Sequence, residues 1–536
     1  MYATAAHDYK TTGPQAVIDG IDRQFQLSKD SLVEITEAFL REFKQGLSKY
    51  GEPMAMIPTF VTGVPDGSET GCVDFLALDL GGTNLRVCEV VLNGDRTFDL
   101  TQQKYKVSDA LKTGEATDLF DYLADSVDAF LTTHAKSTAS AHIPGTESPY
   151  PTKADYNPEI VNLGLTFSFP VEQTALDEGK ILTWTKGFSA KHAVGNDVVK
   201  LLQDAFDRKH LHVRCVALVN DTVGALLSRA YTGGGCTLGA IFGTGTNGAY
   251  VEQVANITKL ANSPAAAKGG HMVINTEWGA FNNTRTHLPN TPYDTSLDRR
   301  SINPRFQAFE KFISGMYLGE ITRNILVSLV DAVPKPLLFS GASSATLNHQ
   351  WGLDTSVMSE VEEAWEAGKE DTYSGKPIDA PDFEALSDES KIDEKAKARL
   401  QKIKDIIVRR LQLPANDVSL RDAAIVRWAC ALVARRAGLL SGTAVAAVLI
   451  QTGRGSLLKG EPNGTNGKAA EPEDKFIVGV DGSLIQFYPN FEPTMREAIR
   501  MLTGESVEKS VEIGLAKDGS GVGAALCALQ AIKQLA

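Results

Sequence analysis

The chain begins with a helical pattern of apolar residues and then changes to a pattern in which strands and helices alternate. In the first segment the apolar positions lie three or four residues apart, at Leu32, Ile35, Phe39, Phe43 and Leu47. This spacing predicts a helix, and Gly51 is suited to end it. Residues 1–27 are expected to form a flexible N-terminal arm, and residues 28–71 the helix and the connection after it.

From residue 72 onward, apolar runs typical of strands are joined by glycine-rich turns. Residues 73–80 and 84–92 flank a Gly-Gly turn, and residues 236–242 and 249–254 flank a second glycine-rich turn. Two hairpins of the same kind suggest two related lobes that face one cleft. The other runs predict strands at 160–169 and 213–219, a strand–turn–strand unit at 478–488, and helices at 116–134, 194–208, 221–231, 304–333, 390–411 and 419–451.

Three segments differ from this alternation. Residues 135–159 are rich in Ser, Thr, Pro and Ala and are expected to form a surface insertion. Residues 459–474 predict a flexible polar loop, and the charged region 340–405 permits no assignment beyond the helix near its end. The last residues form a glycine-rich turn that opens a helix.

Composition and charge exclude several classes of protein and of partner. Of the 536 residues 43% are hydrophobic and 22% charged, the balance of an ordinary globular protein. The net charge is −13 and no long run of Lys or Arg exists, so nucleic acid and membranes are not expected partners. Six scattered cysteines and the lack of a signal-like start favour a cytoplasmic protein. The most apolar stretch, 437–453, is expected to be a buried helix.

Several turns have the glycines and hydroxyls that can cradle a phosphate group. The sequence lacks a G-x-x-x-x-G-K-[ST] motif, and it lacks the H-R-D and D-F-G motifs of protein kinases. Residues 243–248, GTGTNG, fit G-x-G-x-x-G, but a strand follows them where a dinucleotide fold needs a helix. A tight hairpin is an equally good interpretation of any one of these turns.

Nine motifs in fixed order resemble the hexokinase family, of the actin-like ATPase fold. They are DLGGTNLR (79–86), TFSFP (166–170), WTKGF (184–188), VNDTVGALL (219–227), FGTGTNGAY (242–250), NTEWGAF (275–281), FEKFISGMYLGE (309–320), VGVDGS (478–483) and DGSGVGAAL (518–526). The resemblance extends over about residues 28–534 and is greatest to the fungal glucokinase branch, on segments 56–71 and 164–188.

The resemblance implies an α/β chain with the two-lobed actin-like (ribonuclease H-like) fold. A small domain is expected at 72–220 plus 518–536, and a large domain at 221–517, with a central cleft between them. Residues 28–71 would pack on the large domain.

The resemblance also implies ATP as co-substrate with Mg²⁺, which Asp79 would organise through water. Such a site agrees with the preference of Mg²⁺ for few carboxylates and several waters. The expected ATP-binding residues are Asp79, Gly81, Gly82, Thr83, Asn84, Arg86, Lys104, Thr244, Gly245, Thr246, Gly315, Gly482 and Ser483. A solvated side chain remains an equal interpretation of Lys104, and close helix packing a nearly equal one of Gly315.

A sugar pocket is implied at Ser168, Thr185, Lys186, Asn220, Asp221, Asn247, Glu277 and Glu310. Amides and carboxylates suit a ring of hydroxyls, each of which donates and accepts hydrogen bonds. Asp221 is expected to be the catalytic base, and Lys186 to neutralise charge. Residues 220–222 are by themselves equally typical of a helix N-cap, and Glu310 alone of a solvated helix carboxylate.

The implied activity is the ATP-dependent phosphorylation of glucose, and of related hexoses such as mannose, at the C6 hydroxyl. This reaction gives hexose 6-phosphate in the first step of glycolysis. The expected partners are glucose and Mg-ATP, and the chain is expected to be a monomer or homodimer. Three alternatives stay open: a general hexokinase that also uses fructose efficiently, a non-catalytic sugar sensor of the same fold, and an actin-like or chaperone-type ATPase.

Overall fold

The computed structural model describes residues 7–70, 75–81, 84–134, 160–184, 187–261, 263–368, 380–459 and 475–535. Two mixed sheets dominate it. The first has the order β4-β3-β2-β5-β8 and consists of β2 (Phe75–Leu80), β3 (Asn84–Leu92), β4 (Phe98–Lys106), β5 (Val161–Phe167) and β8 (Val213–Val219). The second has the order β1-β11-β10-β9-β12-β13 and consists of β1 (Ile57–Pro58), β9 (Leu238–Phe242), β10 (Thr246–Gln253), β11 (His271–Asn275), β12 (Phe476–Asp481) and β13 (Val511–Leu515).

The two sheets repeat one topology. In the first sheet, β2 pairs antiparallel with β3 and parallel with β5. In the second sheet, β9 pairs in the same way, antiparallel with β10 and parallel with β12. A fifth parallel strand, β8 or β13, completes the order on that side. The repeated hairpin that the sequence predicts is therefore confirmed. A small antiparallel pair, β6 (Val171–Ala175) and β7 (Glu178–Ile181), stands apart from both sheets.

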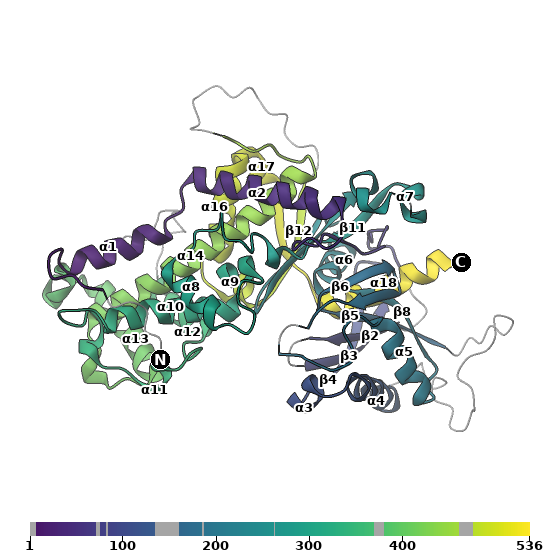
Figure 1. Cartoon of the computed structure of the whole chain (residues 1–536), viewed down its shortest axis with the longest axis horizontal. Helices are drawn as coiled ribbons and strands as arrows, with labels where there is room; N and C mark the ends of the chain where they lie inside the picture. The colour runs from purple at the N-terminus through teal and green to yellow at the C-terminus, as the bar shows by residue number, and fades with distance from the viewer. Residues whose placement is uncertain are drawn as a thin grey trace.

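Helices cover the sheets and fill one end of the elongated molecule (Figure 1). Those around the first sheet are α3 (Asp109–Thr113), α4 (Ala116–His134), α5 (Val198–Arg208) and α18 (Gly519–Leu535). The others are α1 (Pro14–Phe25), α2 (Lys29–Ser48), α6 (Asp221–Gly233), α7 (Pro264–Lys268), α8 (Pro292–Arg300), α9 (Ala308–Ile313), α10 (Gly315–Val330), α11 (Ala345–Asn348), α12 (Thr355–Glu366), α13 (Glu394–Leu411), α14 (Leu420–Gln451), α15 (Ser483–Phe487), α16 (Phe491–Thr503) and α17 (Glu505–Ser510).

Two helices join the sheets. Helix α18 contacts β2, β5 and β8 of the first sheet, and α6 contacts β9, β10 and β12 of the second. The helices also pack on each other, and glycines permit a close approach: a Cβ on Gly523 would lie 2.2 Å from the Cα of Gly224. A larger residue at either position would push the sheets apart.

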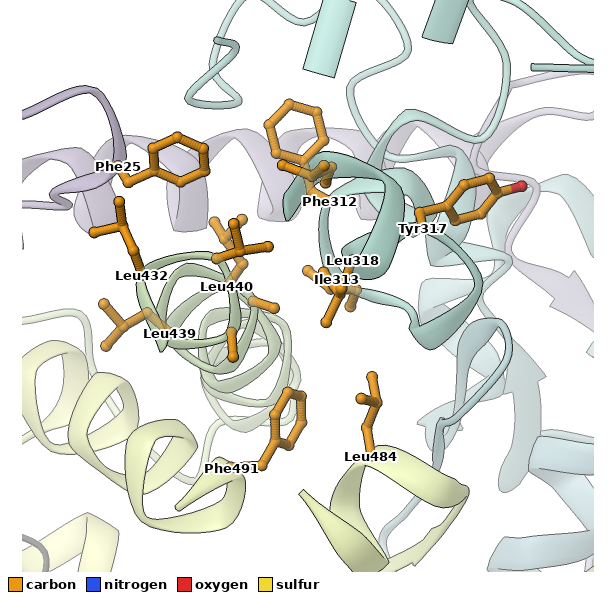
Figure 2. Close-up of a cluster of buried hydrophobic side chains, with 14 of the residues drawn as sticks. Phe25, Phe312, Ile313, Tyr317, Leu318, Leu432, Leu439, Leu440, Leu484 and Phe491 are labelled. Atoms are coloured by element: carbon orange, nitrogen blue, oxygen red, sulfur yellow. The ribbon is translucent and has the colours of Figure 1, made fainter. Parts of the chain in front are cut away.

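Helix α14 is the centre of the largest core. It is long and apolar enough to cross a membrane, but most of it is buried inside the protein. In Figure 2, Leu432, Leu439 and Leu440 of this helix lie among aromatic and aliphatic side chains from α1, α9, α10, α15 and α16. The helix expected at 419–451 is thus confirmed, and its most apolar stretch, from residue 437 onward, is buried as expected up to the end of the helix at Gln451.

Two expectations are wrong. Residues 14–25, expected in a flexible arm, form helix α1, because Val17, Ile18, Ile21 and Phe25 give it an apolar face that packs on the core. Residues 483–487, expected as a strand, form helix α15, whose Leu484 is buried against β9 and β12. The insertion expected at 135–159 lies outside the described residues, as does nearly all of the polar loop at 459–474.

A buried ion pair fixes α14 to the rest of this core. Arg436, with none of its surface exposed, donates to both carboxylate oxygens of Asp294 at 2.8 and 2.7 Å. Its guanidinium also lies over the rings of Phe25 and Phe312, 4.5 and 4.8 Å from their centroids. One charge thereby connects α1, α8, α9 and α14.

We expect Asp294→Ala to lower the free energy of unfolding by about 3–5 kcal/mol, because the Arg436 charge would stay buried without its partner. Thermal and urea unfolding followed by circular dichroism measure this loss. The control is Lys509→Ala, which removes an exposed pair with Glu505 and should leave the midpoint unchanged. Equal midpoints for both variants would contradict the assigned role of the buried pair.

Candidate active site

The first expected phosphate turn lies at the end of β2 and presents a buried ion pair. Asp79 is 7% exposed, and its Oδ2 accepts from Nε and Nη2 of Arg86 at 2.9 and 2.6 Å. The two residues are register partners on β2 and β3, and Lys104 is the partner of Arg86 on β4. Lys104 is exposed. Asp79, Arg86 and Lys104 are therefore neighbours on three adjacent strands of the first sheet, β2, β3 and β4.

Three further carboxylates from other elements join this pair in one charged cluster: Asp518 and Asp481 interact with Arg86, and Asp221 interacts with Asp481. Asp481 ends β12, Asp518 precedes α18 and Asp221 begins α6. Burial raises the pKa of Asp481, and the charges of Asp221 and Asp518 raise it further, while the Gly482 N–H and Arg86 oppose the change. The ends of both sheets and the starts of the two joining helices thus meet at one acidic cleft.

The second phosphate turn, between β9 and β10, is tied to α9 and α10. Thr246 N donates to Oε2 of Glu310 at 3.1 Å, and a Cβ on Gly245 would lie 2.7 Å from that oxygen. Met316 N donates to Thr244 O at 3.2 Å. The Thr246 hydroxyl donates to Ile241 O and accepts from Trp278 Nε1, so it serves the fold and does not extend into the cleft.

Glycines bring this turn against the residues expected near the nucleoside. Gly315 N donates to Gly243 O at 2.7 Å, and a Cβ on Gly315 would lie 3.1 Å from that oxygen. Gly482 has φ 116°, and a Cβ there would lie 2.4 Å from the carbonyl of Phe242. Close packing and a positive φ require glycine at 482, whereas a side chain at 315 would be tight. Ser483 follows Gly482 as the first residue of α15.

The sequence left open whether residues 220–222 form a helix N-cap or hold the catalytic base, and Asn220 and Asp221 differ in their contacts. Asn220 is the N-cap of α6, because its Oδ1 accepts from Thr222 N at 2.9 Å and from the Thr222 hydroxyl at 2.7 Å. Asp221 is half-buried, and its carboxylate makes no hydrogen bond to any other residue in the described part of the chain. The carboxylate of Asp221 is therefore not needed as the cap of this helix.

A chain of polar side chains leads from Asn220 to Glu277. Asn247 Nδ2 lies 3.5 Å from Asn220 Oδ1 and donates to Asn275 Oδ1 at 2.7 Å. Asn275 Nδ2 donates to Glu277 Oε1 at 2.8 Å, and Glu277 N donates back to Asn275 Oδ1 at 3.3 Å. Asn275 thereby holds both ends of Glu277, whose backbone is left-handed at φ 54°. The arrangement forms one wall suited to a row of hydroxyl groups.

Asp298 is a positioning residue that the sequence analysis missed. This buried carboxylate accepts from Lys311 Nζ at 2.7 Å, from Arg305 N at 3.0 Å, and from the guanidinium of Arg285. Lys311 follows Glu310 on α9, so these bonds fix the helix that presents Glu310. Burial opposes ionisation, but the hydrogen bonds from Lys311 and Arg285 keep the pKa of Asp298 below its ordinary value.

Gln307 is a second residue that the sequence analysis missed. It is buried, precedes α9 with a left-handed φ of 52°, and lines a groove with Glu277. Its position just before the motif FEKF was the available signal. The charge partners of Asp298 lie up to 13 residues away, so no local pattern announced that residue.

Several expected residues are not placed. The described residues do not include Gly82, Thr83, Thr185, Lys186 or the side chain of Asn84. Ser168 follows β5 and is buried, and Gly81 follows β2. The expected roles of all these residues stay predictions.

The donor set is compatible with Mg²⁺. No three His, Cys, Asp or Glu side chains gather as a metal site in the ranges that the structure describes. Mg²⁺ needs no such cage, because it keeps several waters and binds substrate phosphates with one or two carboxylates. Asp79, a buried carboxylate beside the first phosphate turn, fits that chemistry.

Two models for hexokinases match the chain, one at residues 17–231 and the other at residues 237–375 and 377–530. The chain belongs to the hexokinase family. It is 40% identical to a glucokinase of Aspergillus niger over 96% of each chain. It is 35% identical to hexokinase-2 of Schizosaccharomyces pombe, with 97% of this chain and 98% of that one covered.

A solved hexokinase structure has the same fold. The hexokinase of Schistosoma mansoni, complexed with glucose, superposes with a TM-score of 0.74 at 32% identity, over 97% of this chain and 100% of that one. The expected two-lobed fold and the resemblance to hexokinases and fungal glucokinases are confirmed. The chain is a hexokinase-type enzyme, and ATP is the co-substrate of this family.

We expect Asp298→Asn to raise the hexose KM about tenfold, equal to about 1.4 kcal/mol, because α9 would hold Glu310 less firmly. The value of kcat should change far less, since Asp298 does not reach the cleft carboxylates. Steady-state kinetics separate the two constants. Glu360→Gln is the matched control: that carboxylate also holds two cations, Arg409 and Arg410, but on α12. A lower kcat at unchanged KM would refute the positioning role.

Proposed function

We propose that this chain transfers the γ-phosphoryl group of ATP to the C6 hydroxyl of glucose. The observation that carries the proposal is the position of Asp221 at the start of α6, where its carboxylate does not serve as the helix cap. On one side, the row of side chains from Asn220 to Glu277 offers three amides and one carboxylate to a sugar. On the other side lie the two phosphate turns with Arg86 and Asp481.

In the proposed mechanism the protein mainly positions the reactants and balances charge, as phosphoryl transfer requires. Asn247 and Glu277 hold sugar hydroxyls, so that the C6 hydroxyl faces Asp221. Glu310 would link the sugar pocket to the second phosphate turn, because its carboxylate accepts a hydrogen bond from Thr246 N in that turn. Asp221 accepts the hydroxyl proton when bonding to phosphorus is advanced.

The phosphates would lie between the turn after β2 and the turn after β9. Backbone N–H groups of these turns would donate to phosphate oxygens, and Arg86 would add positive charge. Asp79 would hold Mg²⁺ through water, and when bound the ion supplies neutralisation of the phosphate oxygens. Closure of the two lobes would exclude water, which otherwise competes as acceptor. Lys186 is proposed to neutralise charge near the transferred group.

We expect Asp221→Asn to bind glucose within about tenfold of the parent and to lose at least about 10² in kcat. Asn keeps the shape and can bond the hydroxyl, but it cannot accept the proton. Glu277→Gln is the comparison: it should mainly raise the KM for glucose, because Glu277 orients the sugar. Calorimetry measures binding and a coupled assay measures turnover. Near-parental kcat in Asp221→Asn would place the base elsewhere in the pocket.

A sugar series tests the substrate. We expect kcat/KM for glucose to exceed that for fructose by at least about tenfold, or about 1.4 kcal/mol. The chain is similar both to a glucokinase and to a hexokinase, and this ratio separates the two activities. One coupled assay with glucose, mannose and fructose gives the values. Equal efficiencies would identify a general hexokinase, and no turnover with any of them would contradict the proposed reaction.

A further inference from the structure

Helix α2 contacts the two segments of the proposed sugar wall that present Glu277 and Glu310, although none of the nine sequence motifs includes this helix. Phe39 of α2 stacks on Phe281, with ring centroids 3.6 Å apart and planes at 13°, and it meets Phe309 edge-on at 5.1 Å. All three rings are fully buried. Phe281 lies four residues after Glu277, and Phe309 directly precedes Glu310. One ring of α2 therefore contacts both segments.

Glu42, three residues after Phe39 on the same helix, adds a polar contact to the first of these segments. Its two carboxylate oxygens accept from Asn282 N at 3.2 and 3.3 Å. Asn282 is 4% exposed and has a left-handed φ of 49°, and it belongs to no helix or strand. Without Glu42 this buried N–H would lose its acceptor, and an unpaired buried donor is costly enough to shift a loop.

The residues at 282 and 283 join the segment of Glu277 to helix α9. Asn283 Oδ1 accepts from Ala308 N, the first residue of α9, at 3.0 Å. Glu310 follows two residues later on the same helix. The hydrogen bond from Asn282 to Glu42 therefore fixes the junction between the segment of Glu277 and the helix of Glu310.

The surroundings of Glu42 oppose its ionisation. Glu42 is half-buried, and this burial raises its pKa to about 6. The hydrogen bond from Asn282 and the charge of Arg41 limit the rise, whereas the charge of Glu52 adds to it. At neutral pH the side chain is still mostly a carboxylate, and a carboxylate accepts a stronger hydrogen bond from an N–H group than a neutral oxygen does.

We propose that Glu42 is a positioning residue for the hexose, because through Asn282 it sets the orientation of Glu277 and the start of α9. The inference rests on the proposed function, in which Glu277 and Glu310 bind the sugar. The proposed base, Asp221, lies on another helix, α6. Loss of Glu42 should therefore weaken sugar binding far more than it slows the transfer step.

The test measures KM and kcat for glucose, and its dissociation constant, in variants of Glu42. We expect Glu42→Ala to raise KM and the dissociation constant about tenfold and to keep kcat within about twofold, because the Asn282 N–H loses its acceptor. Glu42→Gln keeps an acceptor oxygen and should raise KM only about threefold. Glu34→Ala is the matched control: Glu34 is exposed on the same helix, and this variant should keep the parental values.

A double-mutant cycle tests whether Glu42 acts through Glu277. In a chain that already carries Glu277→Gln, Glu42→Ala should raise KM by no more than about threefold, because the orientation that it disturbs has less left to hold. A full increase of about tenfold in that chain would mean that the two residues act independently, and it would overturn the proposal.

Circular dichroism and the unfolding midpoint separate positioning from stability. A lower midpoint in Glu42→Ala with a parental KM would make Glu42 a purely structural residue and would overturn the proposal. If Glu42→Ala does not fold, Glu42→Gln takes its place, and a parental KM in that variant has the same meaning. Failure of the parent to bind or phosphorylate glucose would instead overturn the proposed function, and the same assay reports it separately.

Discussion

The close contact between α6 and α18 is the constraint on which the cleft depends. Glycines at 224, 519 and 523 let the backbones meet, and Ser228 of α6 donates to Lys517 O just before α18. Thr166 of β5 donates to Ser520 O and fixes the start of α18 to the first sheet. Each helix starts at the cleft and covers a different sheet. The carboxylate at the start of α6 and that before α18 are therefore placed by the same packing that joins the lobes. A motion of one sheet relative to the other would act on this contact, and Asp221, at the start of α6, lies beside it.

The sugar wall is held by backbone conformations that tertiary contacts impose. Glu277 and Gln307 both have positive φ values in the left-handed region, which residues other than glycine rarely adopt. Asn275 supports the first from two sides, and the network at Asp298 fixes the helix that follows the second. Such strain persists only where the surroundings determine it, and it is concentrated at sites that bind or react. The conformation of the wall is thus fixed by Asn275 and by the hydrogen bonds of Asp298.

The sequence predicted what depends on local order along the chain. The strand at 213–219 and the helix after it were correct, because an apolar run and a cap lie next to each other. Helix α1 was missed, since its short apolar face has meaning only against α14. The contact between Trp278 Nε1 and the Thr246 hydroxyl joins residues 32 positions apart, and no local pattern predicted it. Residues that act through long-range bonds, such as Asp298, leave no mark in a local motif.

The charge of the cleft explains why the proposed reaction needs a cation. The chain has a net charge of −13, and Asp79, Asp481 and Asp518 add local negative charge around Arg86, with Asp221 close enough to act on Asp481. A triphosphate entering this region would be repelled, and the repulsion is stronger where water is excluded. Arg86 is shared with Asp79, so it cannot neutralise several phosphate charges. The acidic cleft and Mg²⁺ would therefore be complementary: the cation would offset the repulsion between these carboxylates and the phosphates of the nucleotide, and Asp79 would hold it through water.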